Sequence, residues 1–117
     1  MKLLTKKILK QLPPLMSQSK VKDPIVPTVF FNPTGRGYWF PYEYDEQSKT
    51  FFGYVSIFGD WNDEFGYFTL AELEEYKGML GLGIERDMHW TPKPLSEACK
   101  AKRVTSLAQF HTRKAES

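Results

Sequence analysis

The sequence predicts an α+β fold, a curved antiparallel sheet of about four to five strands with one packed helix and a short N-terminal helix. Two observations lead to this class. Aromatic residues form two runs, over 38–45 and 50–58, separated by a polar turn, as in a β-hairpin. Residues 69–77 then combine a helix-start signal with apolar residues at helical spacing. The length of 117 residues indicates one domain with a single core.

The N-terminal residues are expected to form a short helix. Thr5 can accept a hydrogen bond from a free backbone N–H at its start, and Ile8 and Leu12 then share one face. Pro13 ends this helix because proline lacks the N–H that a further turn requires. Further along, residues 28–31 are predicted to form a strand at a sheet edge, where the flanking prolines are tolerated.

The clearest strand pattern covers residues 38–45, in which every second residue is aromatic. Pro41 lies within this run and indicates a bulge or an edge position, since proline cannot donate to a strand ladder. Residues 50–58 supply the second strand of the hairpin. An acidic loop over 59–66 follows, and residues 67–68 are expected to form only a brief strand.

The best-marked helix begins at Thr69. Thr69 and Glu72 have the spacing of a capping box, in which each side chain accepts a free backbone N–H of the other residue. Gly78 is a suitable C-terminal stop. This helix is therefore expected to pack on one face of the sheet.

The C-terminal third is predicted to contain one more strand and a short helix. Residues 84–90 have the period of two that a strand shows, and residues 96–98 can form the helix. Residues 99–117 lack a clear apolar period. We therefore assign residues 1–98 to a single domain and residues 99–117 to a basic C-terminal tail.

The cellular compartment is indicated by cysteine content and hydropathy. Cys99 is the only cysteine, so no disulfide can form within the chain, and a reducing compartment is expected. Lysines interrupt the apolar positions of the first 12 residues, which is unlike a signal peptide. No apolar run approaches the roughly 18 residues that a membrane span requires. We expect a cytoplasmic protein without membrane association.

The net charge of +2 conceals an uneven distribution. Residues 1–22 carry six lysines and no acid, which amounts to +6. Residues 23–98 carry thirteen acids against five bases, or −8, and residues 99–117 carry five bases against one acid, or +4. An acidic body with basic ends bears on partners and solubility rather than on the fold.

Several short blocks of sequence, in order within residues 3–97, suggest a family. They are Leu3-Leu4-Thr5 through Leu12-Pro13-Pro14-Leu15, Phe31-Asn32-Pro33-Thr34-Gly35, Glu43-Tyr44-Asp45, Phe52-Gly53, Gly66-Tyr67-Phe68-Thr69-Leu70-Ala71-Glu72-Leu73 and Leu82-Gly83-Ile84-Glu85-Arg86-Asp87. Together they resemble a family of small bacterial proteins catalogued only as a domain of unknown function. Its members occur largely on plasmids and integrative elements, often beside genes for DNA modification, transfer and antirestriction. The resemblance implies that context and supplies no functional residue.

The acidic loop and the start of the following helix form the first candidate site. An aromatic side chain ringed by charge is typical of a binding hot spot, and carboxylates can attract Arg and Lys groups of a nucleic-acid-binding protein. We therefore expect a non-enzymatic interaction protein of mobile-element origin that modulates a host-defence or DNA-processing protein. The alternative is a solubilising surface with a half-buried tryptophan. The residues concerned are Asp60, Trp61, Asp63, Glu64, Glu72 and Glu75.

Direct nucleic-acid binding by the basic termini is the second hypothesis. Phosphate binding by lysine and arginine would make the affinity fall steeply with salt. The aromatic residues of the hairpin could stack on bases, but neighbouring acids make that hairpin a poor nucleic-acid surface, and we assign its rings to the core. The basic residues of the tail are Lys100, Lys102, Arg103, Arg113 and Lys114.

A small metal-dependent enzyme is the third hypothesis. Alternation would place Glu85, Asp87 and His89 on one face of a strand, where they could bind a divalent metal or act in acid–base chemistry. The alternative is the solvated face of an edge strand, since metal sites normally draw ligands from several elements. No complete catalytic motif is recognised, no cofactor is expected, and a non-enzymatic role is preferred.

Overall fold

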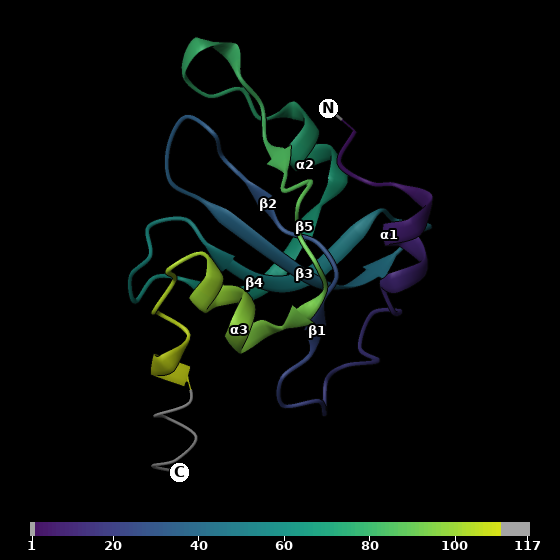
Figure 1. Cartoon of the computed structure of the whole chain (residues 1–117). Helices are drawn as coiled ribbons and strands as arrows, with labels where there is room; N and C mark the ends of the chain where they lie inside the picture. The colour runs from purple at the N-terminus through teal and green to yellow at the C-terminus, as the bar shows by residue number, and fades with distance from the viewer. Residues whose placement is uncertain (1, 111–117) are drawn as a thin grey trace.

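The computed structural model describes residues 2–110, apart from the side chain of Met79 (Figure 1). Its helices and strands are short except in one hairpin. In chain order they are α1 (Lys6–Gln11), β1 (Ile25–Val26), β2 (Phe30–Phe31), β3 (Tyr38–Asp45), β4 (Thr50–Ser56), β5 (Glu64–Thr69), α2 (Leu70–Glu75), a 3₁₀ turn (Met79–Gly81), β6 (Glu85–Arg86), β7 (Lys93–Pro94) and α3 (Leu95–Ala101).

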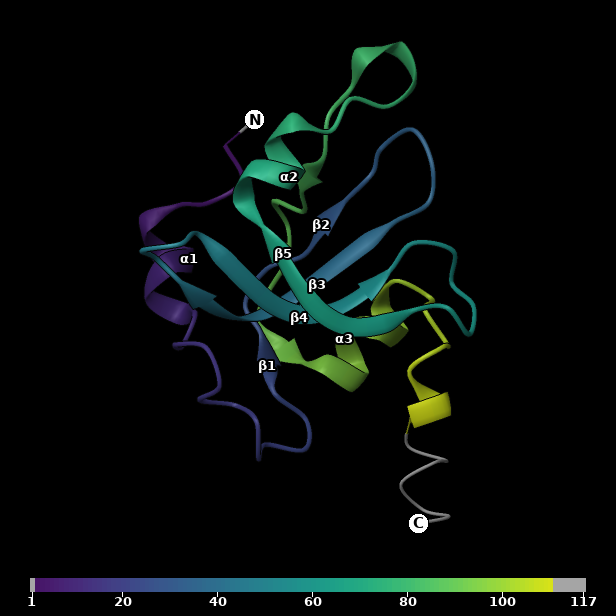
Figure 2. The same cartoon turned by 180° about the vertical axis from the view of Figure 1, so that it is seen from behind.

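The strands form a five-stranded antiparallel sheet in the order β5-β4-β3-β2-β6, and β1 and β7 form a separate two-stranded ribbon. The sheet curves strongly, with α1 and α2 toward one side and α3 toward the other (Figures 1 and 2). The α+β class and the number of strands in the main sheet are thus confirmed, whereas the β1–β7 ribbon was not predicted. None of the helices among residues 2–110 has the length and apolar character that a membrane span requires.

The hairpin formed by β3 and β4 contains the predicted bulge. The pairing register shifts between Pro41 and Glu43, so that Tyr42 is the extra residue on β3. Opposite the bulge, a Cβ atom on Gly53 would lie 2.1 Å from the carbonyl oxygen of Phe40, closer than any real contact. Only glycine therefore permits β4 to approach β3 at this point.

The sheet has an apolar core on each face. The first core, beside α1 and α2, contains Tyr44 and Phe51, and the second core, beside α3, contains Phe40, Tyr42 and Tyr54. A regular period of two would have placed Tyr42 and Tyr44 on the same face. The bulge separates them, because one extra residue reverses the direction of every side chain that follows.

The predicted capping residues occupy their expected places. Thr5 Oγ1 accepts the N–H of Ile8 at 3.2 Å, and Thr69 Oγ1 accepts the N–H of Glu72 at 3.1 Å. Helix α3, by contrast, is capped from a distance, since Asp23 accepts the N–H of Ser96 at 2.9 Å. These contacts show that α1 and α2 begin through local chemistry, whereas α3 needs the folded chain.

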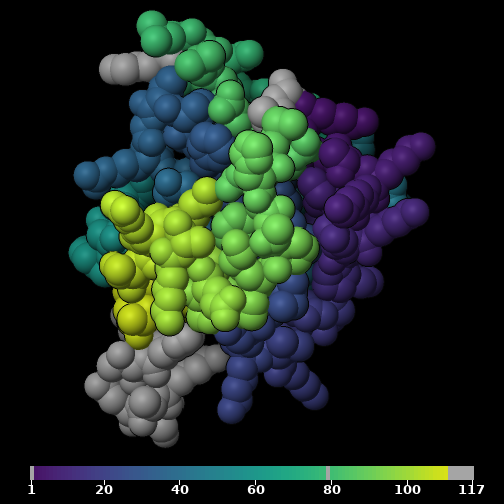
Figure 3. Space-filling view, viewed as in Figure 1, coloured from purple at the N-terminus to yellow at the C-terminus, as the bar shows by residue number. Residues whose placement is uncertain are grey.

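The C-terminal residues differ most from the sequence prediction. The strand predicted over 84–90 is limited to Glu85–Arg86 in β6. The N–H of Asp87 still donates to the carbonyl of Val29 at 3.0 Å, and a turn at residues 88–89 then leads the chain away. The expected domain boundary at residue 98 falls inside α3, and Val104 and Leu107 beyond it are buried in the second core. Figure 3 shows the C-terminal part of the chain, light green and then yellow, packed over the middle and left of one face of the molecule. The rest of the expected tail, residues 111–117, lies outside the described residues.

Candidate functional site

Strand β5 is an edge of the five-stranded sheet, paired with β4 on one side only. In Figure 2 no other labelled element lies in front of it. The N–H of Leu70, just after β5, donates to the carbonyl of Lys49 at 3.0 Å. Because backbone groups alternate in direction along a strand, those of Glu64, Gly66 and Phe68 face β4 and those of Phe65 and Tyr67 face outward.

The outward backbone groups of Phe65 and Tyr67 have no hydrogen-bond partner within residues 2–110. The side-chain amide of Gln109 donates a hydrogen bond to the carbonyl of Asp63 at 3.3 Å. Asp63 precedes β5, so this hydrogen bond does not occupy the backbone of Phe65 or Tyr67. Edge strands of native proteins are commonly blunted by proline, lysine or a bulge. Strand β5 contains no proline or lysine, and its pairing register with β4 is regular. Among the residues that the structure describes, nothing pairs with this edge, and it is open to an added strand.

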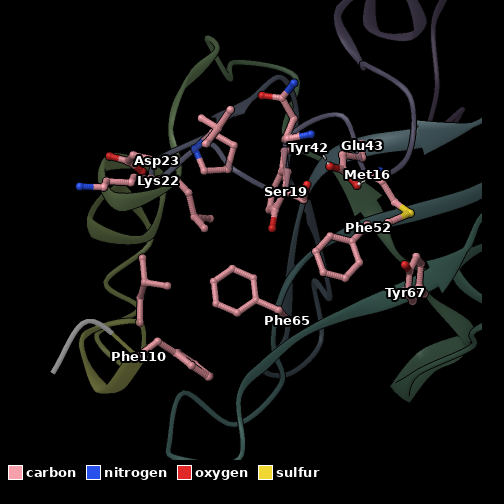
Figure 4. A pocket seen from close by; sticks show the side chains of 15 residues that line it. Met16, Ser19, Lys22, Asp23, Tyr42, Glu43, Phe52, Phe65, Tyr67 and Phe110 are labelled. Carbon is pink, nitrogen blue, oxygen red and sulfur yellow. Dashed lines mark hydrogen bonds between the residues drawn. The ribbon is translucent and has the colours of Figure 1, made fainter. Parts of the chain in front are cut away.

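A cavity of about 520 Å³ lies beside β5 on the α3 face of the sheet (Figure 4). We call it the aromatic cavity. Its floor comes from β3, β4 and β5, and its rim comes from residues 16–24 and from the segment after α3. Its volume is within the usual range for ligand-binding pockets. It is lined by Met16, Gln18, Ser19, Val21, Lys22, Asp23, Pro24, Tyr42, Glu43, Phe52, Phe65, Tyr67, Leu95, Leu107 and Phe110.

Five rings in the wall of the aromatic cavity form three edge-on contacts. Phe52 lies 5.7 Å from Tyr42 between ring centroids, and 4.8 Å from Tyr67. Phe65 packs against Phe110, which lies in a helical turn over residues 108–110, with 5.1 Å between the ring centroids. Such edge-on pairs hold aromatic side chains in defined orientations. The cavity therefore has a shaped apolar wall that reaches the open edge of β5.

A buried carboxylate holds the rim of the aromatic cavity in place. The two oxygens of Glu43 accept the N–H groups of Met16 and Gln18, each at 2.8 Å. Next to it, burial and then the charge of Glu43 raise the pKa of Tyr42 to about 12. The phenol of Tyr42 is thus neutral at physiological pH and keeps its proton for donation.

A second depression, of about 280 Å³, lies on the opposite face of β5. We call it the acidic hollow because Glu64 from β5 and Glu72 from α2 lie in its lining. Tyr67, at the strand edge, lines both this hollow and the aromatic cavity, and its side chain is 62% exposed. The full lining is Trp39, Val55, Ile57, Phe58, Asn62, Asp63, Glu64, Gly66, Tyr67, Phe68 and Glu72.

The loop between β4 and β5 bounds the acidic hollow and exposes two large rings. Trp61 is 79% exposed and Phe58 is 61% exposed, and Asp60 beside them is also exposed. The acids Glu64 and Glu72 have no ion pair with any residue in the described part of the chain. The structure therefore places Glu64 and Glu72 in one hollow and Asp60 and Trp61 in the loop that bounds it. Phe58 and Tyr67 were not predicted to belong to this surface.

Asp63 does not belong to the exposed surface. It is 3% exposed, and its Oδ2 accepts the hydroxyl groups of Ser56 at 2.7 Å and Ser106 at 2.6 Å. Its other oxygen accepts the N–H of Gly59 at 3.3 Å. Asp63 therefore joins the loop, β4 and the C-terminal segment. Glu75, at the far end of α2, is exposed but does not line the acidic hollow.

The three residues considered for a metal site are not brought together as ligands. Asp87 Oδ2 binds Lys102 Nζ at 2.7 Å, and Asp87 Oδ1 accepts the N–H of His89. Burial raises the pKa of Asp87, but the hydrogen bonds and the positive charge of Lys102 outweigh it and leave the pKa below its usual value. Within residues 2–110 no group of three or more His, Cys, Asp or Glu side chains could hold a metal ion. Glu85 lies in the short strand β6.

The basic residues considered for nucleic-acid binding are not equivalent. Lys102 is half-buried, pairs with Asp87, and lies 5.7 Å from the ring centroid of Trp90. Lys100 and Arg103 are exposed. Arg113 and Lys114 lie outside the described residues. Lys102 thus has a structural role, and the described part of the segment offers two exposed basic side chains among those predicted.

Comparison with known proteins identifies a family. The profile of a family described as a protein of unknown function (DUF2958) matches residues 3–107. The match includes the edge strand, both depressions except Phe110, and the buried segment after α3. No curated protein and no solved structure matches the chain.

Proposed function

We propose that this chain, which belongs to the DUF2958 family, is a non-enzymatic protein that binds a basic protein partner in the cytoplasm. The observation that carries this proposal is the 79% exposed ring of Trp61, in the loop that bounds the hollow lined by Glu64 and Glu72, two acids without an ion pair among residues 2–110. The partner is a host-defence or DNA-processing protein, and binding modulates it, as in antirestriction. The sequence resemblance to proteins of plasmids and integrative elements supports this choice of partner.

The exposed rings favour a binding surface over a solubilising one. A tryptophan leaves a large apolar area in water at 79% exposure, and Phe58 and Tyr67 add to it. Isolated exposed apolar side chains are common, but Phe58 and Tyr67 line the same hollow and Trp61 lies in the loop that bounds it. Exposed apolar groups gathered in this way are typical of interaction sites. Aromatic anchors surrounded by charged groups are where binding energy usually concentrates.

The distribution of charge supports a basic partner. The lysine-bearing helix α1 and the loop between β4 and β5 lie on opposite sides of the molecule in both views (Figures 1 and 2). The lysines of α1 therefore do not cover the acids of the surface. Unpaired carboxylates at a rim accelerate association with a positive partner and reject a negative one.

Quantitative affinity purification from host lysate tests this proposal. The bait is the whole chain, either unchanged or with Trp61→Ala, Glu64→Gln and Glu72→Gln combined. A matched control combines Glu97→Gln in α3 with Glu46→Gln in the β3–β4 turn, which removes two exposed acids elsewhere. We expect the surface variant to lose about tenfold or more of one captured basic protein and the control to retain it.

The proposal makes two further demands on that captured protein. It should be a nucleic-acid enzyme or a defence component, and its affinity for the purified chain should fall as salt screens the carboxylates. Equal capture by all three baits would exclude this surface. Capture of proteins with no link to nucleic acids or defence would exclude the proposed class of partner.

A further inference from the structure

We infer that the partner contributes an extended segment that pairs with β5 as a sixth strand, with apolar and basic side chains in alternation. The inference rests on the proposed function, because it states how the partner occupies that surface. Pairing at an open sheet edge is a common mode of peptide recognition, in which backbone hydrogen bonds provide affinity and pockets for alternate side chains provide specificity.

The backbone of β5 supplies the first half of this argument. The N–H and C=O groups of Phe65 and Tyr67 face away from β4 and are unpaired within residues 2–110. Two such residues, separated by one, match the hydrogen-bonding period of a strand. The strand is also undistorted, since its register with β4 runs without a break from Glu64 to Thr69. An incoming strand therefore finds a regular row of donors and acceptors.

The two depressions supply the second half, because they lie on opposite faces of β5. Side chains of an added strand alternate between the faces of a sheet. Residues paired with Phe65 and Tyr67 direct their side chains toward the aromatic cavity, where the lining is mainly apolar. The residue between them lies opposite Gly66, on the face of the acidic hollow. The expected order in the partner is therefore apolar, basic, apolar.

Gly66 leaves room for the basic residue. A Cβ atom placed on Gly66 would meet no atom within 4 Å, so the surface beside the partner's central side chain is open. Glu64 from β5 and Glu72 from α2 line the same hollow. A lysine or arginine there can lay its methylene groups along the apolar part of the lining and direct its charge to these carboxylates.

Charge distinguishes a basic partner from a second copy of this chain. Pairing of two β5 strands would bring the Glu64 side chain of one copy onto the sheet face that carries Glu64 and Glu72 of the other. Like charges placed across a strand pair are destabilising. The edge is therefore suited to a foreign basic segment, and self-association is the alternative outcome of the experiment.

Synthetic peptides of seven residues, blocked at both ends, test the inference on the full chain. The probe alternates valine and lysine, and its matched control alternates valine and glutamate. We expect the lysine peptide to bind at least about tenfold more tightly by fluorescence anisotropy. Its largest amide shifts in ¹H–¹⁵N spectra should occur in β5. Equal affinity of the two peptides, or shifts confined to other strands, would overturn the inference.

Backbone pairing is tested separately from side-chain contact. Tyr67→Pro removes an outward N–H without removing a bond to β4, whereas Tyr67→Val removes the same side chain and keeps that N–H. We expect peptide affinity to fall about tenfold or more in the proline variant and about threefold or less in the valine variant. N-methylation of alternate peptide amides gives the same test on unchanged protein, should the proline variant fail to fold.

The outcomes separate this inference from the proposed function. If Glu64→Gln with Glu72→Gln weakens capture of the partner while Tyr67→Pro matches Tyr67→Val, the surface is correct and strand addition is wrong. If neither set of variants affects the captured partner, both proposals fail. A concentration-dependent dimer that Tyr67→Pro abolishes, with no binding of the lysine peptide, would assign the edge to a second copy and overturn the basic partner.

Discussion

The β3–β4 hairpin and strand β5 are built from similar aromatic residues but end in opposite environments. Phe40, Phe51 and Tyr54 of the hairpin are completely buried, whereas Tyr67 of β5 is largely exposed. The difference arises from position, because the hairpin strands have a neighbour on each side and β5 has one only. An aromatic ring in the centre of the sheet stabilises the fold, and the same kind of ring at the edge remains available to a partner.

The largest difference between these two regions is expected at their glycines. Gly53→Ala should destabilise the protein by about 5 kcal/mol or more or prevent folding, because the new Cβ would overlap the Phe40 carbonyl oxygen. Gly66→Ala in β5 should change stability by less than about 0.5 kcal/mol, since its Cβ would enter open space. Urea denaturation of both variants measures the difference. Similar stability of the two variants would contradict the described bulge.

Large aromatic side chains should show the next largest difference. Phe51→Ala removes a fully buried ring of the first core and should cost about 3–5 kcal/mol. Tyr67→Ala should cost less than about 1 kcal/mol, because most of that ring is already in water. Thermal unfolding followed by circular dichroism provides the measurement. A large loss for Tyr67→Ala would mean that β5 is covered in the native protein.

Alkaline pH should reveal the burial of the tyrosine next to Glu43. Tyr42 titrates near 10 when unfolded and at about 12 when folded, so the native state holds this proton more tightly. The contribution of the neutral Tyr42 phenol to the free energy of unfolding is complete below pH 10 and is lost as the pH rises toward 12. Allowing for screening by water in the cavity, we expect it to amount to about 1–2 kcal/mol.

Urea unfolding at pH 9 and at pH 11.5 measures that contribution. The unchanged protein should lose more stability over this interval than Tyr42→Phe, which lacks the ionisable hydroxyl. Other buried groups with a raised pKa, including Tyr54 and Cys99, are present in both proteins and cancel in the comparison. Parallel losses in the two proteins would contradict a buried phenol at this position.

The smallest effect on stability is expected for the most exposed ring. Trp61→Ala should change the free energy of unfolding by less than about 0.5 kcal/mol while reducing partner capture. The same chemical denaturation assay and the quantitative purification give the two readings. A destabilisation above about 2 kcal/mol would indicate that Trp61 packs in the fold, and its effect on capture would then report unfolding.

Much of the fold followed from local patterns. The alternation over residues 38–45 and the polar turn after it predicted the hairpin, and Thr5 and Thr69 predicted two helix starts. Strand β5 was predicted too short because glutamate and glycine interrupt its apolar pattern, although pairing with β4 extends it from Glu64 to Thr69. The strand predicted over residues 84–90 was too long, since the alternation of residue types continues through a turn at residues 88–89.

The candidate site was only partly accessible from sequence. Trp61, Glu64 and Glu72 were predicted because aromatic and acidic residues cluster locally in the chain, and the structure leaves their side chains exposed. Asp63 lies in the same acidic stretch of sequence, yet its side chain is buried and accepts a hydrogen bond from Ser106, 43 positions away. The aromatic cavity was missed because its lining comes from distant segments and has no local pattern.

The sequence by itself determined the fold class, the hairpin, the starts of α1 and α2, and the acidic character of the central region, and it left open whether Pro41 marked a bulge or a sheet edge. These features depend on contacts between near neighbours, whose geometry is set by backbone hydrogen bonding and side-chain period. Only the tertiary structure decided that β5 is an open edge, that Asp63 is buried and that a depression lies on each face of that strand. Those properties depend on which distant segments meet, and burial is a property of that assembly rather than of any local stretch of residues.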